Sequence, residues 1–143
     1  LMAGFFEEIG WTGFALPRML GTRGALEVAV VLGLVQTIWH LAADFLTGSE
    51  SRGVYWLPHF AVFILSMTAM RVLLVWAYAN TRSVLLAQLV HASSTGSLAV
   101  LVPLSLSAAQ DTLFYAVYSV VLWGAVAVIV ALFGKDLVRQ HAG

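Results

Sequence analysis

The sequence contains no cysteine and little charge. Only 10% of its 143 residues are charged and 61% are hydrophobic, whereas an average soluble domain is about 25% charged. The lack of cysteine excludes a disulfide framework, a thiolate metal site and a cysteine nucleophile. Seven basic and seven acidic residues cancel, and no run of like charge offers a nucleic-acid surface, so we expect no nucleic-acid partner. A water-soluble globule is excluded, and the lipid bilayer is the expected surroundings.

Long apolar segments dominate the chain instead. A helix needs about 20 apolar residues to cross the hydrocarbon core, so this length allows four to five crossings. Five such segments can be read from the sequence: 1–20, 24–46, 57–78, 83–104 and 112–133. We therefore predict an all-α, polytopic transmembrane helical bundle with about five spans. Residues 47–56 are expected to form a loop, and segment 112–133, which has no ionisable residue in its interior, is expected to form a lipid-facing wall.

The two ends and the links suggest an orientation. The chain starts at Leu1 with an apolar stretch and without the leader of a signal peptide, so we expect it to be the C-terminal part of a larger bundle. Lys and Arg concentrate in cytoplasmic loops, and Arg52 stands alone on one side of the predicted bundle. The other side collects Arg18, Arg23, Arg82, Lys135 and Arg139. This pattern predicts a cytoplasmic C-terminus, with residues 134–143 forming a polar, frayed tail.

Several ionisable residues fall inside the apolar segments. Each costs at least about 2.5 kcal/mol at the membrane centre, so we expect them to gather around a polar cavity. The set comprises Glu7, Glu8, His40, Asp44, Arg71 and His91. At about 1.5 Å rise per residue, Glu7, His40 and His91 are predicted to share a depth near mid-membrane. The simpler alternative is that these side chains only form hydrogen bonds between helices.

The spacing within each helix limits what these residues can do. Glu7 and Glu8 are about 100° apart around a helix, so we expect one to do chemistry and the other to be held by a partner. Asp44 follows His40 by one turn, where it could orient the imidazole or lie as an acid at the outer interface.

A second pair lies one turn apart in segment 83–104. His91 and Thr95 share a helix face and could present two hydrogen-bond donors to one substrate oxygen. Helix packing is an equal alternative for Thr95. His59 and His141 are expected to be solvated surface histidines.

Three stretches of sequence resemble a known family. They are EEIGWTGFALPRML at 7–20, WHL at 39–41 and TRSVLLAQLVHASSTGS at 81–97. In order and spacing they resemble the motifs of the CPBP intramembrane proteases, the group that includes the CAAX prenyl endopeptidases and the bacterial Abi proteins. The resemblance covers residues 1–104 and implies one protease domain over 1–143, incomplete at its N-terminus, in a prokaryotic cell membrane. It also implies that Glu7 and His40 activate water while His91 and Thr95 stabilise the oxyanion of peptide hydrolysis.

Three positions depart from that family pattern. The family usually has Arg at the position of Thr12, an aromatic residue at that of Gln36, and Asn at that of Thr95. Because Thr12 cannot neutralise Glu8, a basic residue from elsewhere is needed, and Arg71 is the one deep in a helix. We predict that Arg71 faces the interior and pairs with Glu8 or Asp44, with snorkelling to the interface as the alternative.

The sequence leaves an alternative open for the cofactor and another for the function. Glu7, His40 and His91 form a two-histidine, one-carboxylate set that suits catalytic zinc, yet the sequence has no HExxH pair on one helix. We therefore favour a metal-independent glutamate mechanism that requires no cofactor. The alternative function is a non-catalytic immunity or scaffold protein of the same fold. A proton-coupled carrier is disfavoured, because a carrier should show paired halves and no repeat is evident in the sequence. The expected substrate is a peptide or membrane protein, prenylated or not.

Overall fold

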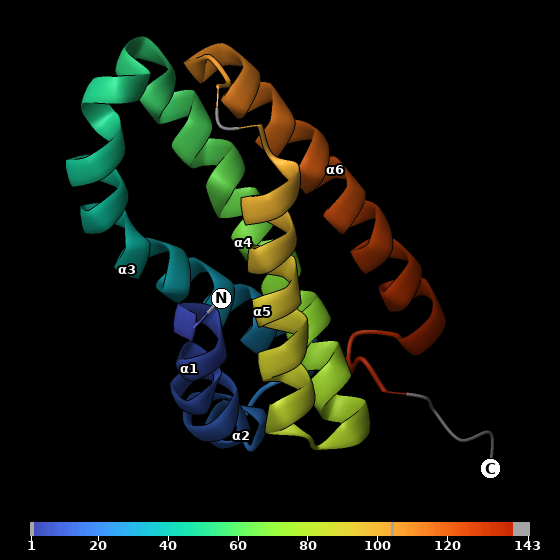
Figure 1. Ribbon diagram of the computed structural model, residues 1–143. Helices are drawn as coiled ribbons and strands as arrows, with labels where there is room; N and C mark the ends of the chain where they lie inside the picture. Colours follow the sequence, from blue (N-terminus) through green and yellow to red (C-terminus); the bar gives the residue numbers. More distant parts are fainter. Residues whose placement is uncertain (1, 104, 139–143) are drawn as a thin grey trace.

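The computed structural model describes residues 2–103 and 105–138, and all regular structure in these ranges is helical (Figure 1). The first helical stretch consists of α1 (Met2–Gly10), a π-helical turn η1 (Trp11–Ala15) and α2 (Leu16–Leu20). Two long helices follow, α3 (Ala25–Arg52) and α4 (Trp56–Thr81), joined by the 3₁₀ turn η2 (Gly53–Tyr55). The last two helices are α5 (Val84–Leu101) and α6 (Ala108–Phe133).

Much of this helical structure is apolar enough to lie in a membrane. Three stretches of the described chain are long and apolar enough to cross a bilayer: Ala25–Thr81, Val84–Leu101 and Ala108–Phe133. The first of them folds as α3 and α4, which run in opposite directions (Figure 1). The protein is therefore an all-α membrane helical bundle, as predicted, with a span count close to the expected five.

Helix α4 organises the bundle. It packs against α3, α5 and α6, while α1 packs mainly against α5. Small and branched apolar side chains make the close contacts of the core, among them Leu16, Val28, Ala29, Leu32, Ala69, Val72 and Val75. The central position of α4 explains how one side chain of this helix can reach partners on several others.

Two glycines allow the backbone contacts that bring the polar side chains together. A Cβ added to Gly33 in α3 would lie 2.8 Å from Thr68 Cα and 3.3 Å from Arg71 Cβ, so α3 and α4 meet without a side chain between them. A Cβ added to Gly4 in α1 would lie 3.0 Å from the His91 ring. These contacts place Arg71 against α3 and His91 against α1.

The π turn lies directly after the two glutamates. In η1 the amide of Leu16 bonds to the carbonyl of Trp11, one residue further back than in an α-helix. Pro17 follows and has no amide hydrogen for the ordinary helical bond. The first stretch stays helical through this wider turn and through Pro17 to Leu20, and Thr12 in the turn is buried.

Two expectations about the polar ends were wrong. Residues 47–52, expected to be loop, continue α3 until Gly53, whose φ of +49° suits glycine and ends the helix. The tail is not frayed over residues 134–138, because Leu137 is fully buried and its carbonyl accepts from Asn80 Nδ2 at 2.7 Å. His141 and the rest of the tail lie outside the described residues.

The links that carry most of the basic residues lie at one end of the bundle. Figure 1 shows the α2–α3 link, the α4–α5 link and the end of α6 there. A hydrogen bond of 3.0 Å from the Leu26 amide to the Lys135 carbonyl joins two of these regions. This arrangement is the one that the predicted membrane orientation requires.

Candidate active site

A cavity of about 220 Å³ lies between α1, α3, α4, α5 and α6. Its lining includes the four residues that the sequence singles out for chemistry: Glu7, His40, His91 and Thr95. Residues of the first, second and fourth apolar segments thus line one cavity, together with residues of the third and fifth. The helical period explains this placement, since each of these residues lies on the inward face of its own helix.

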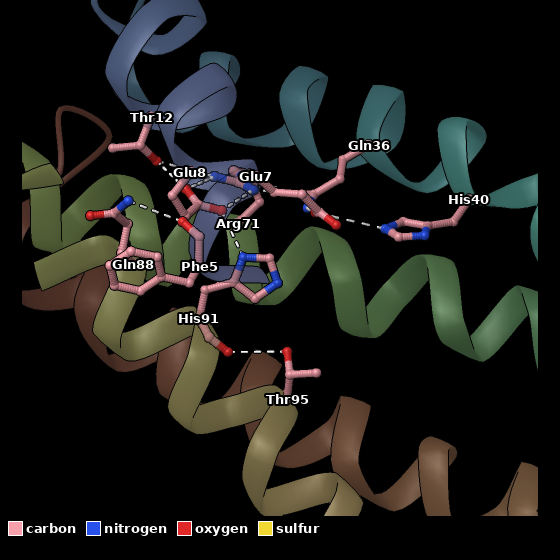
Figure 2. Close-up of polar contacts among 10 residues, drawn as sticks. All are labelled: Phe5, Glu7, Glu8, Thr12, Gln36, His40, Arg71, Gln88, His91 and Thr95. Atoms are coloured by element: carbon pink, nitrogen blue, oxygen red, sulfur yellow. Dashed lines mark hydrogen bonds and ion pairs between the residues drawn. The ribbon is translucent and has the colours of Figure 1, made fainter. Parts of the chain in front are cut away.

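Glu8 lies beside this cavity at the centre of a buried ion-pair network (Figure 2). Its two carboxylate oxygens accept from Arg71 Nη1 and Nη2, each at 2.8 Å, and both side chains are fully buried. The Thr12 hydroxyl donates to Oε2, and His91 Nδ1 lies 2.7 Å from Oε1. The predicted pairing of Arg71 with Glu8 is thus present, and Arg71 does not snorkel.

Glu7 points in another direction, toward α3 (Figure 2). Gln36 Nε2 donates to Glu7 Oε2 at 3.0 Å, and His40 Nε2 lies 3.9 Å from the same oxygen. The Glu7 side chain is 15% exposed and that of His40 is 30% exposed, so both remain accessible from the cavity. The two adjacent glutamates therefore have separate surroundings, as their 100° separation around the helix predicts.

Two departures from the family pattern occur together in this network. Arg71 comes from α4 and occupies the place beside Glu8 that an Arg at position 12 is expected to fill. Gln36 Oε1 accepts from Arg71 Nε at 3.1 Å and from Nη2 at 2.5 Å. Sequence reasoning marked Gln36 only as a departure from the family pattern one turn before His40, and did not predict its place in this network.

His91 and Thr95 lie one turn apart on α5. His91 is held at Nδ1 by Glu8 and packs its ring edge on Gly4. Thr95 Oγ1 donates to the His91 backbone carbonyl at 3.1 Å, a common use of a threonine hydroxyl within a helix. The hydroxyl lines the cavity but would have to rotate away from this carbonyl in order to donate to a substrate.

Helix α6 also contributes to the cavity. Tyr115 and Tyr118 are part of the lining, and Tyr118 Oη lies 2.8 Å from Ser94 Oγ on α5. The expectation that this segment forms only a lipid-facing wall was wrong. The spacing of the two tyrosines, three residues apart on one helix face, is the signal that could have identified them.

Asp44 does not orient His40, contrary to one of the two expectations for it. Its carboxylate accepts from Arg52 Nη1 at 3.3 Å and from Trp56 Nε1 at 2.9 Å. The cause is the extension of α3 beyond residue 46, which brings Arg52 back over Asp44 two turns later. Asp44 therefore joins the end of α3 to the start of α4 and does not line the cavity.

His59 is not solvated, and that expectation was wrong too. Its side chain is 2% exposed, its ring packs against Tyr115, and its Nδ1 lies 3.4 Å from Asp111 Oδ2. Because Arg52 also contacts Asp111 at 3.2 Å, the outer ends of α3, α4 and α6 are joined by one set of polar contacts. The histidine follows Pro58 at the start of α4, but the sequence does not show that α6 covers it.

A zinc site would require Glu7, His40 and His91 to converge on one point. In the part of the chain that the structure describes, no group of three or more His, Asp or Glu side chains is placed to hold a metal ion. Glu7 Oε2 and His40 Nε2 lie 3.9 Å apart, and His91 faces Glu8 through Nδ1, which leaves Nε2 as its other ring nitrogen. The proposed ligands Glu7, His40 and His91 therefore do not fit a zinc site in this arrangement.

Comparisons with known proteins identify the family of the chain. A family model described as type II CAAX prenyl endopeptidase Rce1-like matches residues 1–97. This range includes the four cavity residues singled out above, Glu7, His40, His91 and Thr95. CAAX prenyl protease 2 of Methanococcus maripaludis is 26% identical over 96 residues, which are 64% of this chain and 35% of that protein. The chain thus spans about a third of this relative, and no solved structure matches it significantly. The chain belongs to the Rce1-like family of type II CAAX prenyl endopeptidases.

Proposed function

We propose that the protein is an intramembrane endopeptidase in which Glu7 and His40 activate water for peptide hydrolysis. The observation that carries this proposal is the approach of His40 Nε2 to within 3.9 Å of Glu7 Oε2 at the wall of a cavity that His91 also lines. This separation is too long for a direct hydrogen bond but allows one water molecule to touch both atoms. The rival function, a non-catalytic scaffold, gives no reason for keeping this pair accessible in a membrane.

The reaction can be written with these side chains alone. A water molecule held between Glu7 Oε2 and His40 Nε2 attacks the carbonyl carbon of the peptide while Glu7 takes a proton from it, acting as general base. The carbonyl oxygen becomes an oxyanion, which His91 stabilises from Nε2, the ring nitrogen not facing Glu8. Because an ionised carboxylate only accepts hydrogen bonds, a ring that donates from Nδ1 to Glu8 and from Nε2 to the oxyanion carries a proton on both nitrogens. The carbon–nitrogen bond then breaks as the proton passes from Glu7 to the leaving amine.

We propose prenylated C-terminal peptides as the first substrate class to test, because the family description and the relative's name both refer to CAAX prenyl substrates. The test is hydrolysis of a quenched peptide panel by the reconstituted protein. The panel contains prenylated CAAX peptides, their unprenylated forms and signal-like apolar peptides. Cleavage of at least one class is expected, at a rate that a strong chelator leaves unchanged. A chelator-sensitive rate restored by zinc would favour the metal alternative, and a protein that cleaves no class would contradict the proposed activity.

Thr95 is proposed as a second, weaker oxyanion donor. Its hydroxyl must give up the bond to the His91 carbonyl in order to act, whereas an Asn amide offers two N–H donors on a longer arm. Loss of an oxyanion donor typically costs about 100- to 1,000-fold in rate. For this poorly placed hydroxyl we expect a smaller loss of rate. Thr95→Ala should lower kcat by about tenfold with little change in KM, and Thr95→Asn should retain or raise activity. An unchanged kcat in Thr95→Ala would assign the residue to helix packing.

We further propose that the protein resides in a prokaryotic cell membrane with its C-terminus in the cytoplasm. Support comes from the basic residues at one end of the bundle, which the positive-inside rule places on the cytoplasmic side. Because the chain lacks cysteine, single cysteines introduced at either end would report their side to an impermeant maleimide. Labelling of the end containing Arg82 from outside intact cells would contradict this orientation.

A further inference from the structure

We propose that Gln36 is a positioning residue that transmits the fixed geometry of the Arg71–Glu8 pair to the carboxylate of Glu7. The role rests on the proposed function, since it concerns the base that activates water. Gln36 does not touch the substrate in this account. It acts through Glu7, by holding the oxygen that faces His40.

The side-chain amide of Gln36 uses both of its ends. Its oxygen accepts from Arg71 Nε at 3.1 Å and Nη2 at 2.5 Å, and its nitrogen donates to Glu7 Oε2 at 3.0 Å. The reverse orientation of the amide would set N–H groups against the guanidinium donors and an oxygen against the carboxylate. Arg71 therefore determines which way the amide points, because a guanidinium has donors and no acceptor.

The amide is itself held rigidly. Gln36 is 1% exposed, and Arg71, which it accepts from, is fixed by two hydrogen bonds of 2.8 Å to Glu8. The close approach of α3 and α4 at Gly33, three residues before Gln36, brings the guanidinium within reach. A rigid chain of contacts therefore runs from α4 through Arg71 and Gln36 to Glu7 on α1.

This chain of contacts selects one oxygen of Glu7. Gln36 Nε2 and His40 Nε2 approach the same atom, Oε2, at 3.0 and 3.9 Å. Without the amide donor, the partly exposed Glu7 side chain would be free to adopt other rotamers within the cavity. A displacement of about 1 Å in a reacting group can cost about 100-fold in rate, so fixing this oxygen matters for the chemistry.

The variant Gln36→Glu distinguishes two possible roles of Gln36, which are donating to Glu7 and accepting from Arg71. The new carboxylate still accepts from Arg71, but it offers Glu7 a negative charge instead of an N–H donor. If Gln36 positions Glu7, kcat of this variant, measured per mole of folded protein, should fall by about 10- to 100-fold with little change in KM. Thr37→Val, at a buried neighbour on the same helix outside the cavity, is the matched control and should keep the wild-type kcat.

Two further variants decide the matter if Gln36→Glu fails to fold. Gln36→His keeps one ring acceptor and one ring donor, whereas Gln36→Met has a similar length and neither. All rates are measured on a panel peptide that the wild type cleaves, per mole of folded protein. A kcat for Gln36→His well above that of Gln36→Met supports the proposal.

Three results would overturn it. Wild-type kcat in Gln36→Glu would show that Gln36 only satisfies Arg71, and equal rates in Gln36→His and Gln36→Met would show that the donor is unnecessary. In both cases the wild type still hydrolyses peptide, so the proposed function survives. A wild type that hydrolyses no peptide removes the proposed function together with this role.

Discussion

Glu7→Gln is expected to lower kcat by about 100- to 10,000-fold, the range that positioned general bases contribute. An amide has nearly the shape of the carboxylate but cannot take a proton from water. The substitution leaves the buried network around Glu8 intact, because Glu7 contacts Gln36 and His40 and not Arg71. The loss of kcat is measured by steady-state kinetics on the reconstituted protein, with a peptide of the panel that the wild type cleaves.

Glu8→Gln is the matched comparison, since it makes the same chemical change one residue away. It removes the charge that faces Arg71 and His91, so we expect lower stability but measurable turnover per mole of folded protein. Equal activity of Glu7→Gln and wild type would remove Glu7 from the mechanism. A larger loss of kcat in folded Glu8→Gln than in Glu7→Gln would exchange the roles of the two glutamates.

Arg71→Met is expected to lower the free energy of unfolding by about 3–5 kcal/mol. Arg71 and Glu8 form a bidentate pair in which both side chains are fully buried. Removing the cation leaves Glu8 with only the Thr12 hydroxyl and His91, and leaves Gln36 Oε1 without its donors. Equilibrium unfolding in detergent, followed by helical circular dichroism, measures the change.

Two further substitutions test the cause of that loss. Adding Glu8→Gln to Arg71→Met removes the uncompensated charge and should restore much of the stability. Adding Thr12→Arg instead returns an arginine to the position that the family usually uses, and should also restore part of it. Arg18→Met, at an exposed arginine, should change the free energy of unfolding by no more than about 0.5 kcal/mol. An Arg71→Met protein as stable as Arg18→Met would contradict the assigned pairing.

The convergence of Glu7, His40 and His91 could be predicted because the membrane restricts polar groups so strongly. A charge inside an apolar helix must face the interior, and the helical rise then fixes its depth. The same reasoning, together with the missing partner at Thr12, predicted that Arg71 pairs with Glu8 or Asp44, and the structure shows the pair with Glu8. These inferences needed only the period of a helix and the cost of burying charge.

Other parts of the site depend on where helices end and which faces meet. Asp44 binds Arg52 because α3 extends to residue 52, a boundary that the polar composition of residues 47–56 conceals. His59 is buried because α6 covers it through Tyr115. The double use of the Gln36 amide follows from the close approach at Gly33, which local sequence does not reveal.

The most direct test of water activation by Glu7 is a single-turnover cleavage in water enriched in oxygen-18. With enzyme in excess over peptide, the new C-terminal carboxylate should carry one labelled oxygen in the first turnover, and Glu7 should carry none. Mass spectrometry of the product and of the tryptic peptide containing Glu7 measures both. An unlabelled product after the first turnover, with the label in the Glu7 carboxylate, would show that Glu7 attacks the peptide directly and would contradict water activation by Glu7.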